Sequence, residues 1–352
     1  MKKFGAILAF VVLSYTQAFA DSHFVATCQY GSPAQVQAAL DQGASVTERN
    51  EFGLTPLLFA AQNNPYPEVI FTLIKAGADI TERDSKGLTP LLEAASWNSN
   101  PNVLLALLKA GANVTERDPN CMTPLIVAAI FNSKPEIIST LLKAGASVAE
   151  RTPDGFTPLI AAAQFNPKPE IITTLLKAGA SVAERNASGW TPLIAAAYNN
   201  NNPEAIPVLL TAGASVTERA SNGVTPLVAA AFNNPNPDVI RALLEAGSNA
   251  TERVADGWTP LLAAAAKNPN PEVILVLLKA GASVTERGVE GVTPLIAAAS
   301  SNPEPKVILA LLKAGSDGKA TNKKGKTAFD CAAENEKIKG TAAYWALNDA
   351  RF

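Results

Sequence analysis

The chain has 352 residues, a length that by itself suggests about two ordinary domains. Charged residues make up 17% and apolar residues 47%, a balance that disfavours intrinsic disorder. Lysine and arginine number 29 against 31 aspartates and glutamates, so no strongly basic face is available for nucleic acid. The single histidine excludes paired-histidine catalysis, and the three cysteines are too few for a disulfide scaffold. The composition therefore argues against an enzyme.

The first twenty residues have the pattern of a secretory signal peptide. Lys2 and Lys3 precede an apolar run, and Ala18-Phe19-Ala20 places small residues where a signal peptidase requires them. The apolar run, residues 4–13, is shorter than the roughly 20 residues of a membrane span. We therefore predict cleavage after Ala20, no membrane span in the mature chain, and export. The Met-Lys-Lys opening resembles bacterial export signals, which implies a periplasmic or secreted product.

The remainder of the chain repeats every 34 residues. Thr-Pro-Leu begins at Thr55, Thr89, Thr123, Thr157, Thr191, Thr225, Thr259 and Thr293, and an altered copy begins at Thr327. A fixed period of this size indicates stacked supersecondary units, so the estimate of two globular domains does not hold. We divide the chain into a degenerate N-terminal capping repeat (residues 21–54), eight repeats (residues 55–326) and a degenerate C-terminal capping repeat (residues 327–352). Both capping repeats are expected to be polar.

Each repeat is expected to form two helices and a loop, as the copy at Thr157 illustrates. Thr157 is a good N-cap and Pro158 suits the first position of a short helix. Pro169 opens a second helix with one apolar stripe, and Gly179 supplies its left-handed C-terminal cap. A turn containing a glycine then leads to the next Thr-Pro-Leu. Because a 34-residue unit cannot bury this stripe alone, neighbouring copies must cover it.

These motifs resemble ankyrin repeats. The resemblance lies in Thr-Pro-Leu, in Leu-Leu-Lys-Ala-Gly-Ala-Ser-Val and in the glycine two residues before each threonine, over about residues 21–345. It implies an all-α solenoid of helix-turn-helix units joined by hairpin-like loops. Two features depart from the family: the unit exceeds the usual length of about 33 residues, and an apolar residue such as Ile160 replaces the usual histidine. Tetratricopeptide repeats share the period but lack the Ala-Gly-Ala-Ser-Val exit.

Two further features of the repeats are expected to be structural. A Glu-Arg dipeptide recurs eight times, from Glu48-Arg49 to Glu286-Arg287. We expect each arginine to pair with the glutamate beside it, which leaves a nearly neutral strip rather than a site for a polyanion. Cys121 occupies a position held by glycine in the other copies, so a strained turn is predicted there.

The aromatic residues concentrate at repeat positions that vary. The resemblance implies that a partner binds on the concave side, through the loop tips, the residue after each turn glycine and the exposed end of each first helix. On this sequence the candidate partner-binding residues are Trp97, Met122, Ile130, Phe131, Phe156, Phe165, Trp190, Tyr198, Phe232 and Trp258. Aromatic side chains are favoured contacts in interfaces. The alternative is that these side chains pack against the next repeat and stabilise the stack.

The sequence thus predicts a non-enzymatic scaffold that is exported and binds an unknown protein partner on its concave face. No glycine-rich phosphate loop or metal-spaced cluster appears. We therefore expect no cofactor, no metal, no small-molecule substrate and no nucleic-acid partner. The alternatives are a structural component of the cell envelope without a specific ligand, and a secreted effector directed at a host.

Overall fold

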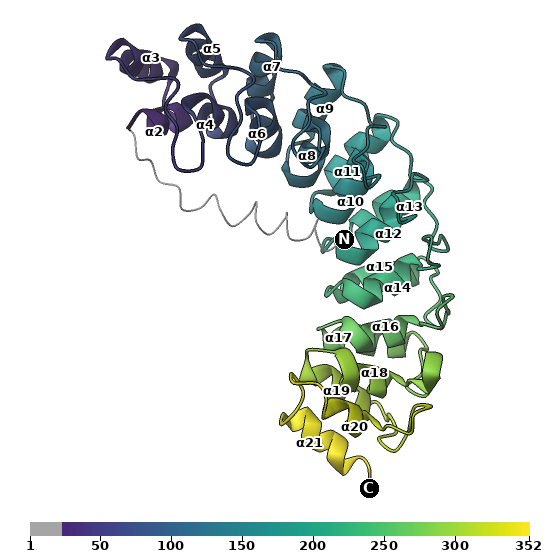
Figure 1. Ribbon diagram of the computed structural model, residues 1–352. Coiled ribbons are helices and arrows are strands. Elements are labelled where there is room, and N and C mark those ends of the chain that lie inside the picture. The colour runs from purple at the N-terminus through teal and green to yellow at the C-terminus, as the bar shows by residue number, and fades with distance from the viewer. Residues whose placement is uncertain (1–22) are drawn as a thin grey trace. The chain divides into compact units, whose positions relative to one another are not determined.

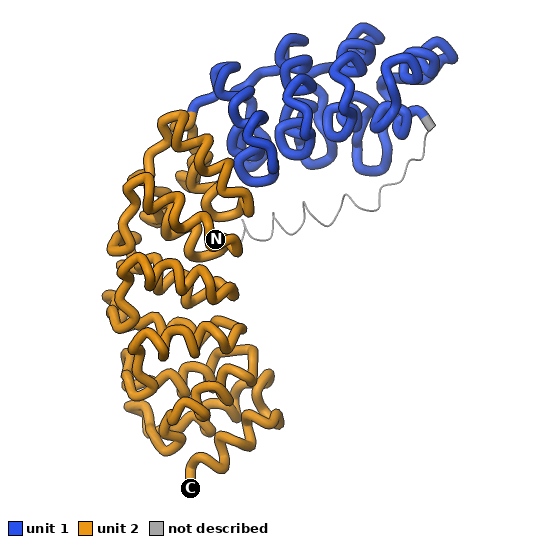
Figure 2. Tube along the Cα trace, turned by 180° about the vertical axis from the view of Figure 1, so that it is seen from behind, with its two compact units in different colours: residues 1–147 blue, residues 148–352 orange. Residues whose placement is uncertain are grey.

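The computed structural model describes residues 23–352, so the predicted signal peptide, residues 1–20, lies outside the described residues. The chain divides into two compact units, residues 1–147 and 148–352 (Figure 2). Each unit is a row of helix pairs (Figure 1), and residues 23–352 contain no strand. The all-α prediction is confirmed.

In the eight repeats that carry Thr-Pro-Leu, the first helix begins directly after the threonine. In the copy at Thr157, the side-chain oxygen accepts a hydrogen bond of 3.2 Å from the backbone N–H of Ile160, and Pro158 is the first helical residue. The first helices of unit 1 are α2 (His23–Tyr30), α4 (Pro56–Asn63), α6 (Pro90–Trp97) and α8 (Pro124–Phe131). Those of unit 2 are α10 (Pro158–Phe165), α12 (Pro192–Asn199), α14 (Pro226–Asn233), α16 (Pro260–Lys267), α18 (Pro294–Ser301) and α20 (Ala328–Ala332).

The second helices other than α13 and α21 begin at a proline, and all except α21 end two residues before a left-handed glycine. Those of unit 1 are α3 (Pro33–Asp41), α5 (Pro67–Lys75), α7 (Pro101–Lys109) and α9 (Pro135–Lys143). Those of unit 2 are α11 (Pro169–Lys177), α13 (Ala205–Thr211), α15 (Pro237–Glu245), α17 (Pro271–Lys279), α19 (Pro305–Lys313) and α21 (Ala342–Asp349). Gly179 has φ of 94°, as its predicted capping role requires.

Helix α13 starts later than the repeat predicts. Pro203 occupies the position at which Pro169 opens α11, yet the helix begins at Ala205. The reason is Pro207, which has no N–H to donate to the carbonyl of Pro203 and therefore removes a hydrogen bond from the first turn of the expected helix.

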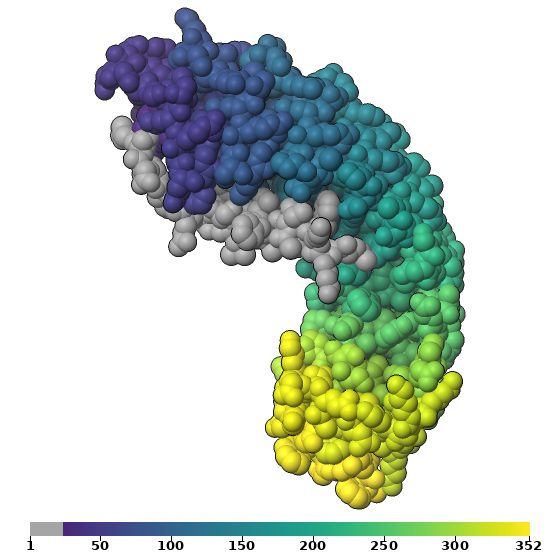
Figure 3. All heavy atoms as spheres, in the orientation of Figure 1, coloured from purple at the N-terminus to yellow at the C-terminus, as the bar shows by residue number. Residues whose placement is uncertain are grey.

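Within each unit, first helices pack on first helices and second helices on second helices, in chain order. Ala161, Ala162 and Ala163 are fully buried, and such small side chains let neighbouring first helices approach closely. The stripe of α11 is buried as predicted, through Ile171, Ile172 and Leu175. Each such side chain contributes roughly 1.5–3 kcal/mol on burial. The space-filling view shows the atoms of neighbouring repeats in contact along each unit (Figure 3).

A ladder of buried asparagines joins the repeats at the turn between the helices. The side-chain amide of Asn234 donates to the carbonyls of Ala197 and Asn200, at 3.1 and 2.9 Å, and its oxygen accepts from the N–H of Asn236. Asn268 then donates to the carbonyl of Asn234 at 2.8 Å, so the ladder continues into the next repeat. Buried amides that satisfy both donors and the acceptor hold the repeats in register.

A second ladder joins the loops, and it runs between repeats. Arg185 Nη1 donates to the carbonyl of Gly189 in its own turn and to that of Arg219 one repeat later, both at 2.7 Å. The Thr225 hydroxyl donates to Glu252 of the following loop at 2.6 Å. Pairing within each Glu-Arg dipeptide was predicted, but the ion pair of Arg49 is to Glu82, one repeat further along, at 3.8 Å.

The turn predicted to be strained at Cys121 has a left-handed backbone, with φ of 61°. Glu290 has φ of 57°, and its loop forms the 3₁₀ turn η1 (Val289–Gly291). Glycine occupies the left-handed position of the other turns, as at Gly189 with φ of 75°. A non-glycine residue in this region costs roughly 1–2 kcal/mol.

The C-terminal cap is less polar than expected. It carries the predicted charged residues, but Trp345 and Phe352 are exposed on it. The ring of Phe329 packs against Tyr344 at 4.6 Å, and the Arg351 guanidinium lies 4.0 Å from the centre of the Phe329 ring. Some aromatic side chains of this cap therefore pack against one another, whereas Trp345 and Phe352 stay exposed to solvent.

Candidate partner-binding face

The residue that follows the turn glycine can lie next to the end of the first helix of the same repeat, as Trp190 does beside Tyr198 of α12. We call this surface the first-helix face; it consists of the residue after each turn glycine and the last two residues of each first helix. Trp190 and Tyr198, which stand at these two places in one repeat, have ring centres 4.8 Å apart. The candidate residues of the sequence analysis all lie on this face.

In unit 1 the candidate residues are largely covered. Met122 and Ile130 are buried, and Trp97 and Phe131 are half-buried with ring centres 5.3 Å apart. The two rings come from neighbouring repeats, so their contact joins α6 to α8. For Met122 and Ile130 the burial supports a packing role.

In unit 2 the first two repeats form one aromatic cluster. Phe156 and Trp190 are buried, with Phe165, Tyr198 and Val224 packed against them in part. Burial raises the pKa of the Tyr198 hydroxyl above its usual range. Phe156 and Trp190 are therefore core residues as well as candidates for binding.

Phe232 and Trp258 are the exposed members of the set, at 37% and 38%. Trp258 stands at the same position as Trp190, which is only 6% exposed. Two neighbouring rings differ between the repeats. Tyr198 packs against Trp190, whereas the corresponding residue after Trp258 is Ala266. Phe165 also packs against the cluster around Trp190, and the position corresponding to it before Trp258 holds Asn233. Binding by any of the ten candidates stays a prediction.

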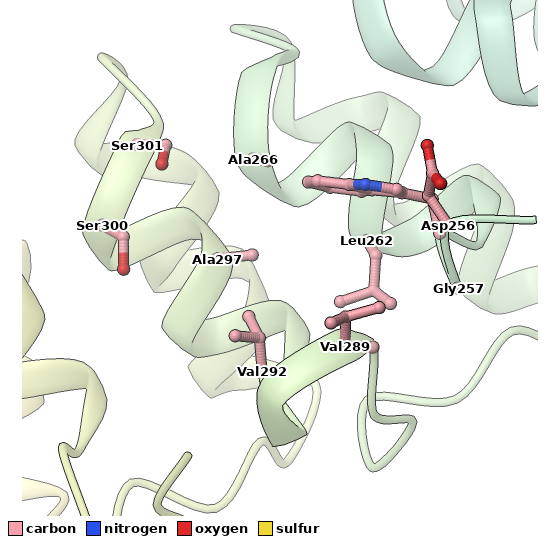
Figure 4. A pocket seen from close by; sticks show the side chains of 11 residues that line it. Asp256, Gly257, Leu262, Ala266, Val289, Val292, Ala297, Ser300 and Ser301 are labelled. Atoms are coloured by element: carbon pink, nitrogen blue, oxygen red, sulfur yellow. The ribbon is translucent and has the colours of Figure 1, made fainter. Parts of the chain in front are cut away.

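The missing ring leaves a hollow of about 230 Å³ between α16 and α18. Its apolar walls include Trp258, Leu262, Val289, Val292 and Ala297, and its rim carries Asp256, Ser300 and Ser301. In Figure 4, Val292 and Ala297 face Leu262 across the opening. Trp258 could be predicted from the sequence as a candidate but the hollow beside it was not, although the small residue eight positions after the tryptophan is a signal for it.

The glutamates of the loops next to this face have raised pKa values. Burial raises the pKa of Glu252 and Glu286, although the hydroxyls of Thr225 and Thr259 and an arginine of the preceding repeat act in the opposite direction. Because these carboxylates accept hydrogen bonds from the preceding repeat, they act as structural acceptors. Across residues 23–352, no group of histidine, cysteine or carboxylate side chains is arranged to hold a metal ion. None of the described helices combines the length and apolar character that a membrane crossing requires.

Comparison with known proteins identifies the repeat. The family model described as ankyrin repeats (3 copies) matches residues 23–118, 125–220, 166–254, 193–288 and 262–343. The chain belongs to the ankyrin repeat family. Among solved structures it is similar to the human ASB11 ankyrin repeat domain, at 25% identity and a TM-score of 0.55, over 64% of this chain and 97% of that one. None of the curated proteins matches the sequence.

The fold and the family agree on the class of function. Ankyrin repeats generally mediate protein–protein interaction, and proteins of this family are typically interaction modules without enzymatic activity. In this chain the ankyrin repeats keep the usual order of helix, turn, helix and loop. The apolar residue that replaces the usual histidine is buried, as Ile160 and Ile194 show, so no polar group is left unsatisfied.

Proposed function

We propose that this ankyrin repeat protein is a non-enzymatic scaffold that is exported and binds a protein partner through the first-helix face. The observation that carries the proposal is the exposure of Trp258 beside an apolar hollow. Phe232, in the preceding repeat of the same unit, adds a second exposed ring. Exposed aromatic side chains beside a pocket are typical anchors of an interface.

The rigidity of the face supports this function. The asparagine and arginine ladders fix each loop to its neighbour, as Asn234 and Arg185 illustrate. A surface that is ordered before binding loses little conformational entropy when the partner arrives. Export rests on residues 1–20 alone, and N-terminal sequencing of the protein from its native cells tests it. We expect the mature chain to begin at Asp21, and an intact Met1 would contradict export.

The binding face is tested by capture with matched variants. The immobilised protein, Trp258→Ala and Leu275→Ala are each exposed to a periplasmic extract, and the retained proteins are identified by mass spectrometry. Leu275 is the control because it is 46% exposed on α17, a second helix of the same unit. We expect one partner to be retained by the unaltered protein and by Leu275→Ala, and lost by Trp258→Ala. Equal retention by all three would overturn the assignment of the face.

A further inference from the structure

The hollow beside Trp258 combines two kinds of surface. Its walls are apolar, because Leu262, Val292 and Ala297 line it together with the indole of Trp258. Asp256 is among the residues that line it, on the wall opposite Val292 and Ala297 (Figure 4); its side chain is exposed, and within residues 23–352 it forms no ion pair. A side chain that fills this hollow meets apolar walls along its length and a negative charge at its end.

The size of the hollow limits what can occupy it. At about 230 Å³ it is smaller than the roughly 300–1,000 Å³ of pockets that take a drug-sized molecule. One long side chain of a partner protein fits this scale better. Val289 is 59% exposed beside the hollow and extends the apolar wall along which such a chain would lie.

The charges near the hollow include the guanidinium of Arg253, which donates to the carbonyls of Gly257 and Arg287, at 3.2 and 2.9 Å, and forms no ion pair with Asp256. Glu290, on the neighbouring loop, lies 4.0 Å from the ammonium group of Lys323, and both are largely exposed. Lys267 follows Ala266 at the end of α16 and is exposed to solvent. The charge of Glu290 is therefore balanced by Lys323, whereas Asp256 has no such partner and is one of the residues that line the hollow.

We infer that the hollow binds an arginine side chain of the partner. This inference rests on the proposed function and names the chemistry that the first-helix face recognises. The guanidinium stacks on the indole of Trp258 and donates hydrogen bonds to the carboxylate of Asp256. The methylene stem of the arginine packs against Leu262 and Val292. A leucine side chain of the partner would form no hydrogen bond with the carboxylate of Asp256. A lysine side chain lacks the planar group that stacks on the indole and donates two parallel hydrogen bonds.

The test uses fluorine NMR of the protein labelled with 5-fluorotryptophan. The chain has four tryptophans, and the Trp258 signal is assigned by its loss in Trp258→Phe. The probe is the capped tripeptide Gly-Arg-Gly, compared with the same peptide carrying citrulline, lysine or leucine in place of arginine. We expect the arginine probe to shift the Trp258 signal saturably and the Trp190 signal not at all. Citrulline, which has no charge, is expected to bind about tenfold more weakly.

Two variants test the two parts of the hollow. Asp256→Asn keeps the shape and is expected to weaken the arginine probe by about tenfold, without affecting the leucine probe. Ala266→Tyr restores the ring that covers Trp190 and is expected to abolish binding of every probe. The signals of the other three tryptophans report whether each variant is folded. The unaltered protein carries the decisive comparison, so a variant that fails to fold does not remove the test.

Three results would overturn the inference: no response of Trp258 to the arginine probe, equal binding of arginine and lysine, and equal binding of arginine and leucine. The variant Tyr198→Ala provides a further control, because it opens space beside Trp190 where Ser188 replaces the carboxylate. There the arginine probe is expected not to bind. If the probe fails while Trp258→Ala still loses the captured partner, the inference is wrong and the proposed function stands. If the probe binds and capture does not depend on Trp258, the proposed function fails instead.

Discussion

The rings of Trp190 and Tyr198 meet edge to face, with their centres 4.8 Å apart and an angle of 65° between their planes. This contact closes the surface of one repeat, and its loss two repeats later leaves Trp258 exposed beside Ala266. The same position of the repeat therefore holds a buried tryptophan in one copy and an exposed one in another, where the neighbouring rings are absent.

We expect Tyr198→Ala to lower the free energy of unfolding by about 1–3 kcal/mol. The substitution removes the edge-to-face pair, which by itself contributes roughly 0.5–1.5 kcal/mol, and uncovers the buried indole of Trp190. Urea denaturation at equilibrium measures the change. The matched variant is Phe232→Ala, at the same position of the next repeat but 37% exposed, and its loss should be clearly smaller. Equal losses would show that the pair does not stabilise the stack.

We expect Asn234→Ala to be among the most destabilising single substitutions in unit 2, at about 3 kcal/mol or more. It removes two donated hydrogen bonds and one accepted one, and leaves the carbonyls of Ala197 and Asn200 without their partner in a buried place. Chemical denaturation is again the measurement. Asn233→Ala is the control, because that half-buried side chain donates only to the carbonyl of Tyr198, at 3.1 Å. A loss no larger than that of the control would contradict the role of the ladder.

The raised pKa values of the loop glutamates determine how the free energy of unfolding is expected to change with pH. Burial raises the pKa of Glu252 in the folded protein above its ordinary value of 4.5. The folded state then binds this proton more tightly than the unfolded state, so the resulting stability is fully present below the ordinary pKa and is lost as the pH rises through the raised pKa. We therefore expect acidification from neutral pH to stabilise the unaltered protein relative to Glu252→Gln.

The pH experiment compares urea midpoints at several pH values between about 7 and 5, the interval above the ordinary carboxyl pKa. Glu170→Gln is the control, since it removes an exposed carboxylate from the first turn of α11. A difference between the unaltered protein and Glu252→Gln that does not grow on acidification would show that burial of this carboxylate is not the dominant effect.

The turn at Cys121 predicts a stabilising substitution. Cys121→Gly removes a side chain from a left-handed conformation but gives the unfolded chain more freedom, so a net gain of about 0.5–1 kcal/mol is expected. The reverse test is Gly189→Ala, where a Cβ would lie 2.6 Å from the backbone nitrogen of Ser221. That variant should be destabilised by more than Cys121→Gly gains. Thermal unfolding of both variants measures the two effects, and destabilisation by Cys121→Gly would contradict the argument.

The repeat, the helix starts and most of the turns can be predicted from the sequence alone. Thr157, Pro158 and Gly179 act within one helical turn of their own position, so their roles can be read without knowledge of the rest of the chain. The later start of α13 was also present in the sequence, in Pro207, but the regularity of the other repeats concealed it.

Which side chains are exposed, and how the repeats are joined, depends on contacts between residues that are far apart in the sequence. Thr225 bonds to Glu252 across 27 residues and Asn234 to Ala197 across 37, distances at which local preference carries no information. Trp190 and Trp258 occupy identical positions in the repeat, yet one is buried and the other lines a hollow. Burial depends on the atoms that neighbouring elements place around a side chain, and these atoms are brought together only when the chain has folded.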